Sequence, residues 1–420
     1  MKYLCIRGGR ALNGAVSVQG AKNAVLPLLA AALAVADRCT LENCPDIRDV
    51  HIALELLRSL GCRAAFADGT VEVDSTDRSG TALDPALAGR MRASVLFLGA
   101  LTAAAGRAEI PLPGGCCLGE RPLDLHLRAL EALGATITER DGSYACRAER
   151  LRGTTVLLRY PSVGATENLM LAALAAEGET TLLGAAREPE ITELAAFLNA
   201  CGARIFGAGS STLHIRGGAL HGCRWRVMPD RMAAATLLCA AASAGGDVLL
   251  ERVRPCELEP VTAALRRAGC TVQAEEETVR LRAGRLHAIP PIVTAPYPGF
   301  PTDAQAPLMA ALLKAEGTTV LEETVFENRF RHVPALRRLG GNVRLAGRMA
   351  SICGVPALHG CRMEATDLRG GAAMLIGALG ALGESRLENI GHLERGYAQL
   401  SQTLRLLGAD VRERYDEPEP

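Results

Sequence analysis

The sequence has no surplus of charge of either sign and is poor in aromatic residues. Its 420 residues contain 46 Lys and Arg against 46 Asp and Glu, and only 3% are aromatic. A protein that binds nucleic acid without sequence preference needs a surplus of cationic side chains to displace counterions from phosphates. We therefore expect no nucleic-acid partner.

Long apolar stretches are missing as well. The longest uncharged apolar run, 24–36, is shorter than the roughly 20 residues that a helix needs to cross a bilayer. The start, MKYLCIRGG, lacks the apolar stretch and small-residue cleavage site of a signal peptide. Hydrophobic residues still make up 49% of the chain, which is enough for a large core. We expect a soluble, cytoplasmic protein without membrane association.

The sequence contains no Cys-x-x-Cys pair and no His-Glu-x-x-His motif. Most of its fourteen cysteines stand singly, and several lie beside apolar residues, as Cys239 does. Twelve are interpreted as reduced thiols that behave as small buried hydrophobic residues. The spacing predicts no metal site, and we expect no cofactor. The two exceptions, Cys116 and Cys117, lie in a glycine-rich loop.

One pattern recurs six times along the chain: a leucine-rich helical stretch, a glycine and a short β-like segment. The glycines are spaced 67 to 73 residues apart, at Gly61, Gly134, Gly202, Gly269, Gly340 and Gly408. A glycine directly after a helix favours the left-handed conformation that ends it. A repeat of about 70 residues is therefore predicted.

A second helix, rich in Ala, Leu and Met, also occurs six times. It is expected to begin near Ala21, Arg92, Gly164, Asp230, Thr302 and Thr366. Side chains this small allow helices to approach closely, so these are predicted to be the buried inner helices. The sequence thus indicates an α/β protein with two helix–strand passages in each of six repeats.

The two ends of the chain complement each other. Residues 4–22 parallel residues 213–231, and the sixth repeat, which ends near Tyr415, lacks its last strands. We expect the N-terminus to supply them. This predicts two domains of three repeats, 21–229 and 230–420 plus 1–20, with an open solenoid as the alternative.

A loop at 112–126 combines three glycines with two thiols and a cation. Arg121 is placed to hold an anion and to lower the pKa of a thiol, so Cys116 or Cys117 is a candidate nucleophile or general acid. The alternative is an ordinary loop with incidental cysteines.

Several polar residues stand where the inner helices begin, where backbone N–H groups favour anions. They are Lys22 and Asn23, the segment 162–166, Thr302 with Asp303, and the arginines Arg92, Arg231 and Arg369, with Arg329 and Arg395 on later segments. We expect an anion-binding cleft between the domains, with a reactive thiol on a loop.

The motifs together resemble a known family. They are GAKNA, MRAS, LPGGC-x-x-G-x-RP-x-DLH, PSVGATEN, PDR, PGFPTD, FENRF-x-HVP, ATDLR and ERGY, in this order from about residue 3 to residue 412. This combination is similar to the UDP-N-acetylglucosamine 1-carboxyvinyltransferases. The resemblance implies an inside-out α/β barrel in two domains, each made of three βαβαββ repeats, which is the enolpyruvyl transferase fold.

The resemblance implies transfer of the enolpyruvyl group of phosphoenolpyruvate to the 3′-hydroxyl of UDP-N-acetylglucosamine, with release of phosphate. This is the first committed step of peptidoglycan synthesis. Cys116 matches the family's loop cysteine, which protonates the methylene carbon or forms an adduct with phosphoenolpyruvate. It also predicts alkylation by the epoxide antibiotic fosfomycin. Asp303 would accept the proton of the sugar hydroxyl or steer it.

The resemblance also assigns the residues that bind the two substrates. Lys22, Arg121 and Arg395 would neutralise phosphoenolpyruvate, with a hydrogen bond from Asn23. The UDP-sugar would be held by Arg92, Arg121, Pro122, Leu123, Asp124, Leu125, Ser162, Val163, Gly164, Asp303 and Val325. Asp367, Leu368 and Arg369 would support the closed site. No partner beyond these substrates is implied, and we expect a monomer.

The chain departs from the family pattern at Tyr160, Ala233, Ala304 and Pro307, which puts affinity or helix geometry in question there. Two alternatives stay open. An enolpyruvylshikimate phosphate synthase would carry a PGSKS-like segment in place of GAKNA and no loop cysteine. A catalytically degenerate paralogue that binds the UDP-sugar would have lost Cys116, Asp303, Lys22 or Arg395.

Overall fold

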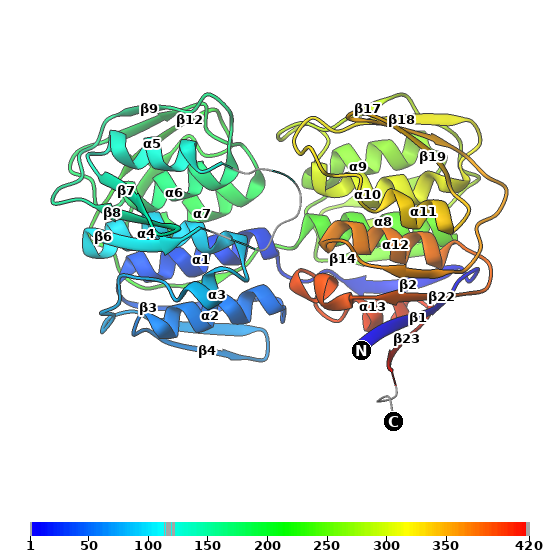
Figure 1. The fold of residues 1–420 in the computed structure, drawn as a ribbon, viewed down its shortest axis with the longest axis horizontal. Coiled ribbons are helices and arrows are strands. Elements are labelled where there is room, and N and C mark those ends of the chain that lie inside the picture. Colours follow the sequence, from blue (N-terminus) through cyan, green and yellow to red (C-terminus); the bar gives the residue numbers. More distant parts are fainter. Residues whose placement is uncertain (1, 113, 115–118, 120–121, 417–420) are drawn as a thin grey trace. The chain divides into compact units, whose positions relative to one another are not determined.

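The computed structural model describes residues 2–112, 114, 119 and 122–416, and these form two compact units. Unit A comprises residues 20–112, 114 and 122–228, and unit B comprises 2–19, 119 and 229–416. Both ends of the described chain lie in unit B (Figure 1). Among the described residues, no helix is long and apolar enough to span a membrane.

Unit A is built of short helices and strands that alternate along the chain. Its helices are α1 (Lys22–Val35), α2 (Arg48–Ser59), α3 (Pro85–Ala88), α4 (Leu96–Ala105), α5 (Asp124–Ala132), α6 (Val163–Ala173) and α7 (Pro189–Ala200), with a 3₁₀ turn η1 (Arg92–Val95). Its strands are β3 (Arg38–Glu42), β4 (Arg63–Ala67), β5 (Thr70–Asp74), β6 (Arg107–Pro111), β7 (Thr136–Arg140), β8 (Ser143–Arg147), β9 (Thr155–Leu157), β10 (Thr180–Leu183), β11 (Arg204–Phe206), β12 (Thr212–Arg216) and β13 (Arg224–Arg226).

Unit B repeats this alternation. Its helices are α8 (Arg231–Ala244), α9 (Pro255–Arg267), α10 (Thr302–Ala311), α11 (Val333–Arg338), α12 (Leu368–Leu379) and α13 (Leu400–Leu406), with 3₁₀ turns η2 (Leu312–Lys314) and η3 (Ile390–Arg395). Its strands are β1 (Lys2–Arg7), β2 (Leu12–Ser17), β14 (Gly246–Glu251), β15 (Thr271–Glu275), β16 (Thr278–Arg282), β17 (Ile292–Val293), β18 (Thr318–Glu322), β19 (Asn342–Ala346), β20 (Met349–Cys353), β21 (Arg362–Glu364), β22 (Glu384–Glu388) and β23 (Asp410–Tyr415).

Within the described residues, the strands form six sheets with one common plan. An edge strand pairs in parallel with a second strand, and a third and a fourth follow in antiparallel pairing. Five sheets have four strands. The sixth, β6-β8-β7, has a single parallel bridge from Ala82 to Glu109 in the edge position. Six copies of one sheet plan match the six repeats expected from the sequence.

Each unit is closed by a strand from a distant part of the chain. In unit A, β13 follows the third repeat but pairs in parallel with β3 of the first. In unit B, β1 lies between β22 and β23, which confirms that the N-terminus completes the last repeat. The second N-terminal strand, β2, pairs instead with β14 of the fourth repeat. The open-solenoid alternative is therefore wrong, because each set of three repeats is closed by these pairings.

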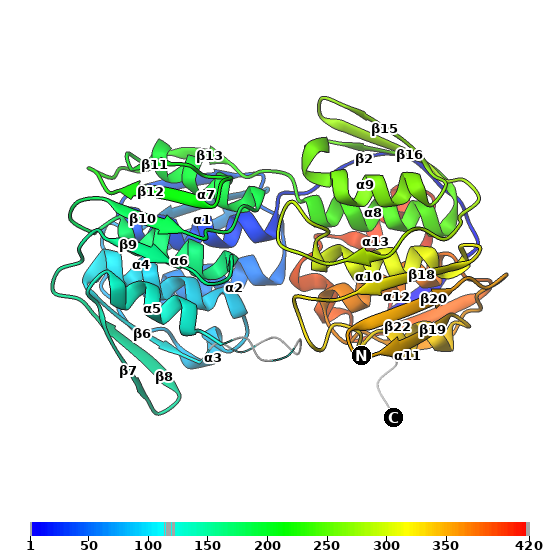
Figure 2. The same cartoon turned by 90° about the horizontal axis from the view of Figure 1, so that it is seen from above.

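The small-residue helices form the core of each unit, as predicted. In unit A, α1, α4 and α6 pack together, and in unit B, α8, α10 and α12 do so, while the sheets lie outside them (Figures 1 and 2). Every residue of α1 from Ala24 to Val35 is buried. With so few large side chains, the core depends on this close helix packing.

The six glycines end their helices in one way. All have positive φ angles, between +89° and +105°. The N–H of each glycine donates to the carbonyl three residues earlier, and the next N–H donates to the carbonyl five residues before it, as Gly269 and Cys270 do to Arg266 and Leu265. This is the Schellman arrangement. A strand begins two residues after each glycine, so the repeat predicted from the glycines is confirmed.

Alanine substitutions at two of these glycines should distinguish the cost of backbone strain from the cost of a steric clash. A Cβ on Gly340 would meet nothing closer than 3.8 Å, whereas one on Gly269 would lie 2.5 Å from the Arg285 carbonyl oxygen. We expect Gly340→Ala to lower the free energy of unfolding by about 1–2 kcal/mol, the usual cost of a left-handed alanine. Gly269→Ala is expected to cost more. Urea unfolding followed by circular dichroism measures both, and equal losses would contradict the steric argument.

Candidate functional site

The loop predicted to carry the reactive thiol lies largely outside the described residues. Cys116, Cys117 and Arg121 all belong to this part of the chain. The assignments of Cys116 as general acid and of Arg121 as an anion-binding residue therefore stay predictions. The remaining predicted residues lie on unit A or unit B, and each unit is considered by itself.

In unit A, Lys22 is fixed at the start of α1 by a buried ion pair. Its Nζ lies 2.7 Å from Oδ2 of Asp49, in the first turn of α2, and the two side chains are 12% and 2% exposed. This ion pair fixes the direction of the lysine side chain. Asn23, one residue later, is exposed. Position 22 thus presents an oriented ammonium group, as an anion-binding role requires.

The segments predicted to bind the UDP-sugar meet at the starts of α5 and α6. Ser162 caps α6 by accepting a hydrogen bond from the N–H of Ala165 at 3.3 Å. A Cβ on Gly164 would lie 3.0 Å from Cε1 of His126, so glycine lets α6 begin directly against the His126 ring of α5. The other predicted residues flank this contact: Pro122 and Asp124 are exposed, Leu123 is buried, and Leu125 and Val163 are half-buried.

A buried polar link that the sequence analysis missed holds these helices together. Asn168 of α6 lies 2.8 Å from Nδ1 of His126, and its Oδ1 accepts a hydrogen bond of 2.6 Å from the N–H of Gly99 in α4. Arg92, half-buried, opens the 3₁₀ turn that leads into α4. The motifs DLH and ATEN contain His126 and Asn168, but no role was assigned to either residue.

In unit B, Asp303 lies in the first turn of α10 between two buried guanidinium groups. Its Oδ1 accepts a hydrogen bond of 2.6 Å from Arg329, and its Oδ2 accepts bonds of 3.1 and 2.9 Å from Nε and Nη2 of Arg369. The side chains of Arg329 and Arg369 are 3% and 4% exposed, against 29% for Asp303. The structure therefore brings three predicted residues into one cluster.

These two cations determine the protonation of Asp303. Burial alone would raise its pKa, but the charges of Arg369 and Arg329 outweigh that effect and hold the pKa well below its usual range. A carboxylate held this way is a weak base. While both arginines stay in place, Asp303 is suited to accept a hydrogen bond from a hydroxyl group rather than its proton.

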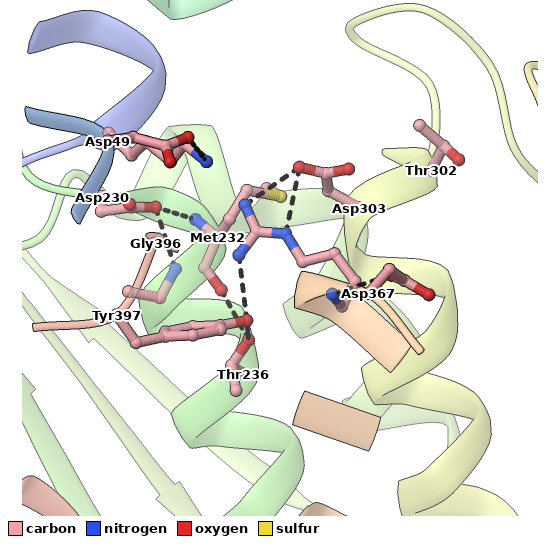
Figure 3. Close-up of polar contacts among 12 residues, drawn as sticks. Asp49, Asp230, Met232, Thr236, Thr302, Asp303, Asp367, Gly396 and Tyr397 are labelled. Carbon is pink, nitrogen blue, oxygen red and sulfur yellow. Dashed lines mark hydrogen bonds and ion pairs between the residues drawn. The ribbon is translucent and has the colours of Figure 1, made fainter. Parts of the chain in front are cut away.

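Arg369 extends the cluster across the core of unit B. Its Nη1 donates to the Tyr397 hydroxyl at 2.9 Å, and this hydroxyl lies 2.9 Å from Oγ1 of Thr236 on α8 (Figure 3). Asp367 caps α12 by accepting from the N–H groups of Arg369 and Gly370. The chain of contacts thus joins α10, α12 and α8. Tyr397 and Thr236 were not predicted.

Val325 is held by another carboxylate that the sequence did not reveal. Oε1 of the buried Glu323 accepts hydrogen bonds from the N–H of Val325 at 2.8 Å and of Phe326 at 3.0 Å, and its Oε2 accepts from the Thr302 hydroxyl. Because the Val325 N–H is engaged, any ligand contact there falls to its carbonyl or side chain.

Arg395 ends the 3₁₀ turn η3 and is half-buried. The segment after it is anchored by Gln19, whose amide donates to the Gly396 carbonyl at 3.0 Å and accepts from the Ala398 N–H at 2.8 Å. The position of Arg395 thus depends on a residue contributed by the N-terminal segment of unit B.

The departures from the family pattern leave the helices intact. The N–H of Ala233 donates to Asp230 at the start of α8, and α10 continues through Ala304 and Pro307 to Ala311. Pro307 has no N–H to donate to the Asp303 carbonyl. Tyr160 is 45% exposed in unit A.

Removing the charge of Asp303 should destabilise unit B. Asp303→Asn leaves two buried guanidinium groups without their carboxylate, and we expect a loss of about 3 kcal/mol in the free energy of unfolding. Because the folded pKa is depressed, the stabilisation is complete above the unfolded pKa of ~3.9 and is lost only as pH falls below it. Urea unfolding measures the free energy of unfolding of Asp303→Asn and of wild type. The difference between the two should stay constant between pH 5 and 8, on the order of this value, and should become smaller in stronger acid. A variant as stable as wild type at neutral pH would contradict this.

His332, fully buried beside this cluster, gives a second pH dependence. Burial lowers its pKa to about 4, so between this value and the unfolded value of ~6.5 the unfolded chain binds the proton first. We expect the free energy of unfolding to fall as pH drops through this window, by at most ~1.4 kcal/mol per pH unit.

In the His332→Gln variant, the free energy of unfolding should no longer carry this dependence on pH. The control is His359→Gln, at an exposed histidine of the same unit, and it should retain the dependence. Unfolding in urea at half-unit pH steps measures all three proteins. Equal slopes for the two variants would show that another group is responsible.

Comparison with known proteins is consistent with this architecture. A sequence model of the family described as EPSP synthase (3-phosphoshikimate 1-carboxyvinyltransferase) matches residues 6–404. A UDP-N-acetylglucosamine 1-carboxyvinyltransferase of Nitratidesulfovibrio vulgaris is 46% identical over 98% of this chain and 99% of its own. A second relative, named UDP-N-acetylglucosamine 1-carboxyvinyltransferase 2, from Caldanaerobacter subterraneus, is 42% identical over 97% of this chain and 98% of its own.

A solved structure shows the same fold. The enolpyruvyl transferase NikO from Streptomyces tendae superposes with a TM-score of 0.88 at 29% identity, over 98% of both chains. The fold predicted from the resemblance is thereby confirmed. The chain belongs to the UDP-N-acetylglucosamine 1-carboxyvinyltransferases of the EPSP synthase family, and it is a transferase with the enolpyruvyl transferase fold.

Proposed function

We propose that this protein transfers the enolpyruvyl group of phosphoenolpyruvate to the 3′-hydroxyl of UDP-N-acetylglucosamine and releases phosphate. The observation that carries the proposal is the 42% to 46% identity, over nearly the whole chain, to proteins named for this reaction. Lys22, Asn23, Cys116 and Asp303 are all present in the matching motifs. In a bacterial cell, the product enters peptidoglycan synthesis.

The reaction is an addition followed by an elimination. The Cys116 thiol donates a proton to the methylene carbon of phosphoenolpyruvate, and the sugar oxygen forms a bond to the neighbouring carbon while its hydroxyl proton passes to Asp303. The resulting ketal then loses a proton from its methyl group to the Cys116 thiolate while the carbon–oxygen bond to phosphate breaks, and the departing phosphate takes up the proton held by Asp303. Lys22, Arg121 and Arg395 neutralise the phosphate and carboxylate groups, and Asn23 donates a hydrogen bond.

The contacts of Asp303 refine its role. Because Arg329 and Arg369 keep it ionised, it accepts a hydrogen bond from the 3′-hydroxyl and orients the oxygen. Full proton transfer to Asp303 requires that at least one of these ion pairs lengthens when substrate binds. Lys22 is similarly held in position by its ion pair with Asp49.

We also infer that the chain forms two domains of three repeats, 21–229 and 230–420 plus 1–20, and that the UDP-sugar is held by the residues at the starts of α5 and α6. The partners are the two small-molecule substrates. The protein acts as a cytoplasmic monomer, without nucleic acid or membrane.

Phosphate release tests the proposal directly. Phosphoenolpyruvate is supplied with UDP-N-acetylglucosamine, with shikimate 3-phosphate, or alone. We expect release only with the UDP-sugar. Asp303→Ala should lose about 100-fold or more in kcat, because it removes the group that orients the hydroxyl. Cys116→Asp should retain activity, since a carboxylic acid can also donate the proton, whereas Cys116→Ser should lose about 100-fold.

The matched control is Cys117→Ser, one residue along the same loop, which should leave the rate unchanged. Release with shikimate 3-phosphate instead would identify the sister activity. Silence with both acceptors, together with retained binding of the UDP-sugar, would identify a degenerate binding protein.

A further inference from the structure

Unit A contains a cluster of three thiols that the proposed reaction does not use. Cys39 is on β3, Cys201 follows the last residue of α7, and Cys223 precedes β13. The sulfur atoms of Cys201 and Cys223 are 3.4 Å apart, and the Cys201 thiol is near enough to Cys39 to lower the pKa of Cys39. Cys39 and Cys201 are buried, whereas Cys223 is partly exposed.

The backbone holds these cysteines together whatever the side-chain rotamers. The His221 N–H donates to the Cys201 carbonyl at 2.9 Å, and the Thr40 N–H donates to the Cys223 carbonyl at 2.9 Å. The parallel pairing of β13 with β3 begins at the next residue, where Arg224 lies opposite Thr40. The contact between the thiols is therefore built into the closure of unit A.

Metal binding does not account for the cluster. Across the residues that the structure describes, no group of three or more His, Cys, Asp or Glu side chains is arranged to hold a metal ion. Two thiols already in contact are instead suited to form a disulfide. The sulfurs have to approach by only about 1.4 Å to reach the bond length of ~2.05 Å.

We propose that Cys201 and Cys223 form a reversible disulfide when the protein meets a hydroperoxide. The oxidant reaches the partly exposed Cys223 first. Its thiolate attacks the peroxide, the O–O bond breaks, and Cys223 becomes a sulfenic acid with release of hydroxide. The Cys201 sulfur then attacks the Cys223 sulfur, and the sulfenic oxygen leaves as water. In total, two thiols and one hydrogen peroxide give one disulfide and two waters.

The environment of each cysteine determines the rate of this oxidation and which thiol reacts first. Burial raises the pKa of Cys223, so little thiolate is present at neutral pH and the rate should increase with pH. The hydrogen bond from Cys201 lowers the pKa of Cys39, but Cys39 is fully buried on β3, away from an incoming oxidant. Exposure therefore selects Cys223 as the first site.

The disulfide joins the end of α7 to the start of β13. It closes a loop that contains β11 and β12, which restricts the unfolded chain, so the oxidised protein should melt at a higher temperature. Trp225, the single tryptophan, lies two residues from Cys223, and its Nε1 donates to Glu193 at 2.9 Å. Its fluorescence should report the change.

The test is titration of the full-length protein with hydrogen peroxide at pH 7 and pH 8.5. Remaining thiols are blocked with N-ethylmaleimide, the protein is digested without reduction, and peptides are identified by mass spectrometry. We expect one cross-linked pair that contains Cys201 and Cys223 and is lighter by two hydrogen atoms. It should form faster at pH 8.5, with a shift in Trp225 emission and a higher melting temperature, and dithiothreitol should reverse all three changes.

Cys223→Ser should abolish the cross-link and both shifts, and Cys201→Ala, at the buried partner, should abolish the cross-link independently. The matched control is Cys361→Ser, at a partly exposed cysteine of unit B, which should leave them in place. A cross-link to Cys39 instead of Cys223 would overturn the assignment of the pair. Oxidation of other cysteines while Cys201 and Cys223 remain alkylated would overturn the proposal itself.

Discussion

The close approach of the inner helices is the constraint on which the rest of the structure depends. A Cβ on Gly99 of α4 would lie 2.3 Å from the Asn168 carbonyl oxygen of α6, and one on Gly380 would lie 2.4 Å from Oγ of Ser243. At such distances only glycine fits. Helices this close bring their first turns together, so short polar side chains reach from one helix to the next. The contacts from Asp303 through Arg369 and Tyr397 follow from this packing.

The cluster around Asp303 shows what burial of charge achieves in such a core. Two guanidinium groups withdrawn from water would be costly without a carboxylate and further hydrogen-bond acceptors. Arg329 and Arg369 share the carboxylate of Asp303, and Arg369 also has the Tyr397 hydroxyl. Each group restricts the others, so the carboxylate is fixed before any ligand arrives. A carboxylate fixed in this way can orient a hydroxyl group through a hydrogen bond. The same two cations make the carboxylate a weaker base, so it is less able to remove a proton.

The sequence predicted the parts of the fold that depend on local chemistry. A glycine that ends a helix and an aspartate that begins one, such as Asp230, act within a few residues, and both appear where expected. The sequence did not predict Glu323, His126 or the contact of Tyr397 with Thr236, whose residues are 161 positions apart. Such contacts arise only when the repeats are stacked. The pairing of β2 with β14 was missed for the same reason, because alternation along one strand does not identify its neighbour.

The cluster of Cys39, Cys201 and Cys223 is another set of contacts between distant residues that the sequence did not predict. Each of its cysteines was interpreted as a single small hydrophobic residue, and the sequence around each supports nothing more. They meet because β13 closes unit A against β3. The same segment continues to Met228, whose carbonyl accepts a hydrogen bond of 2.8 Å from the N–H of Ala21, the residue that precedes Lys22. The disulfide proposed above would join the end of α7 to the start of this segment, whose other end holds the beginning of α1.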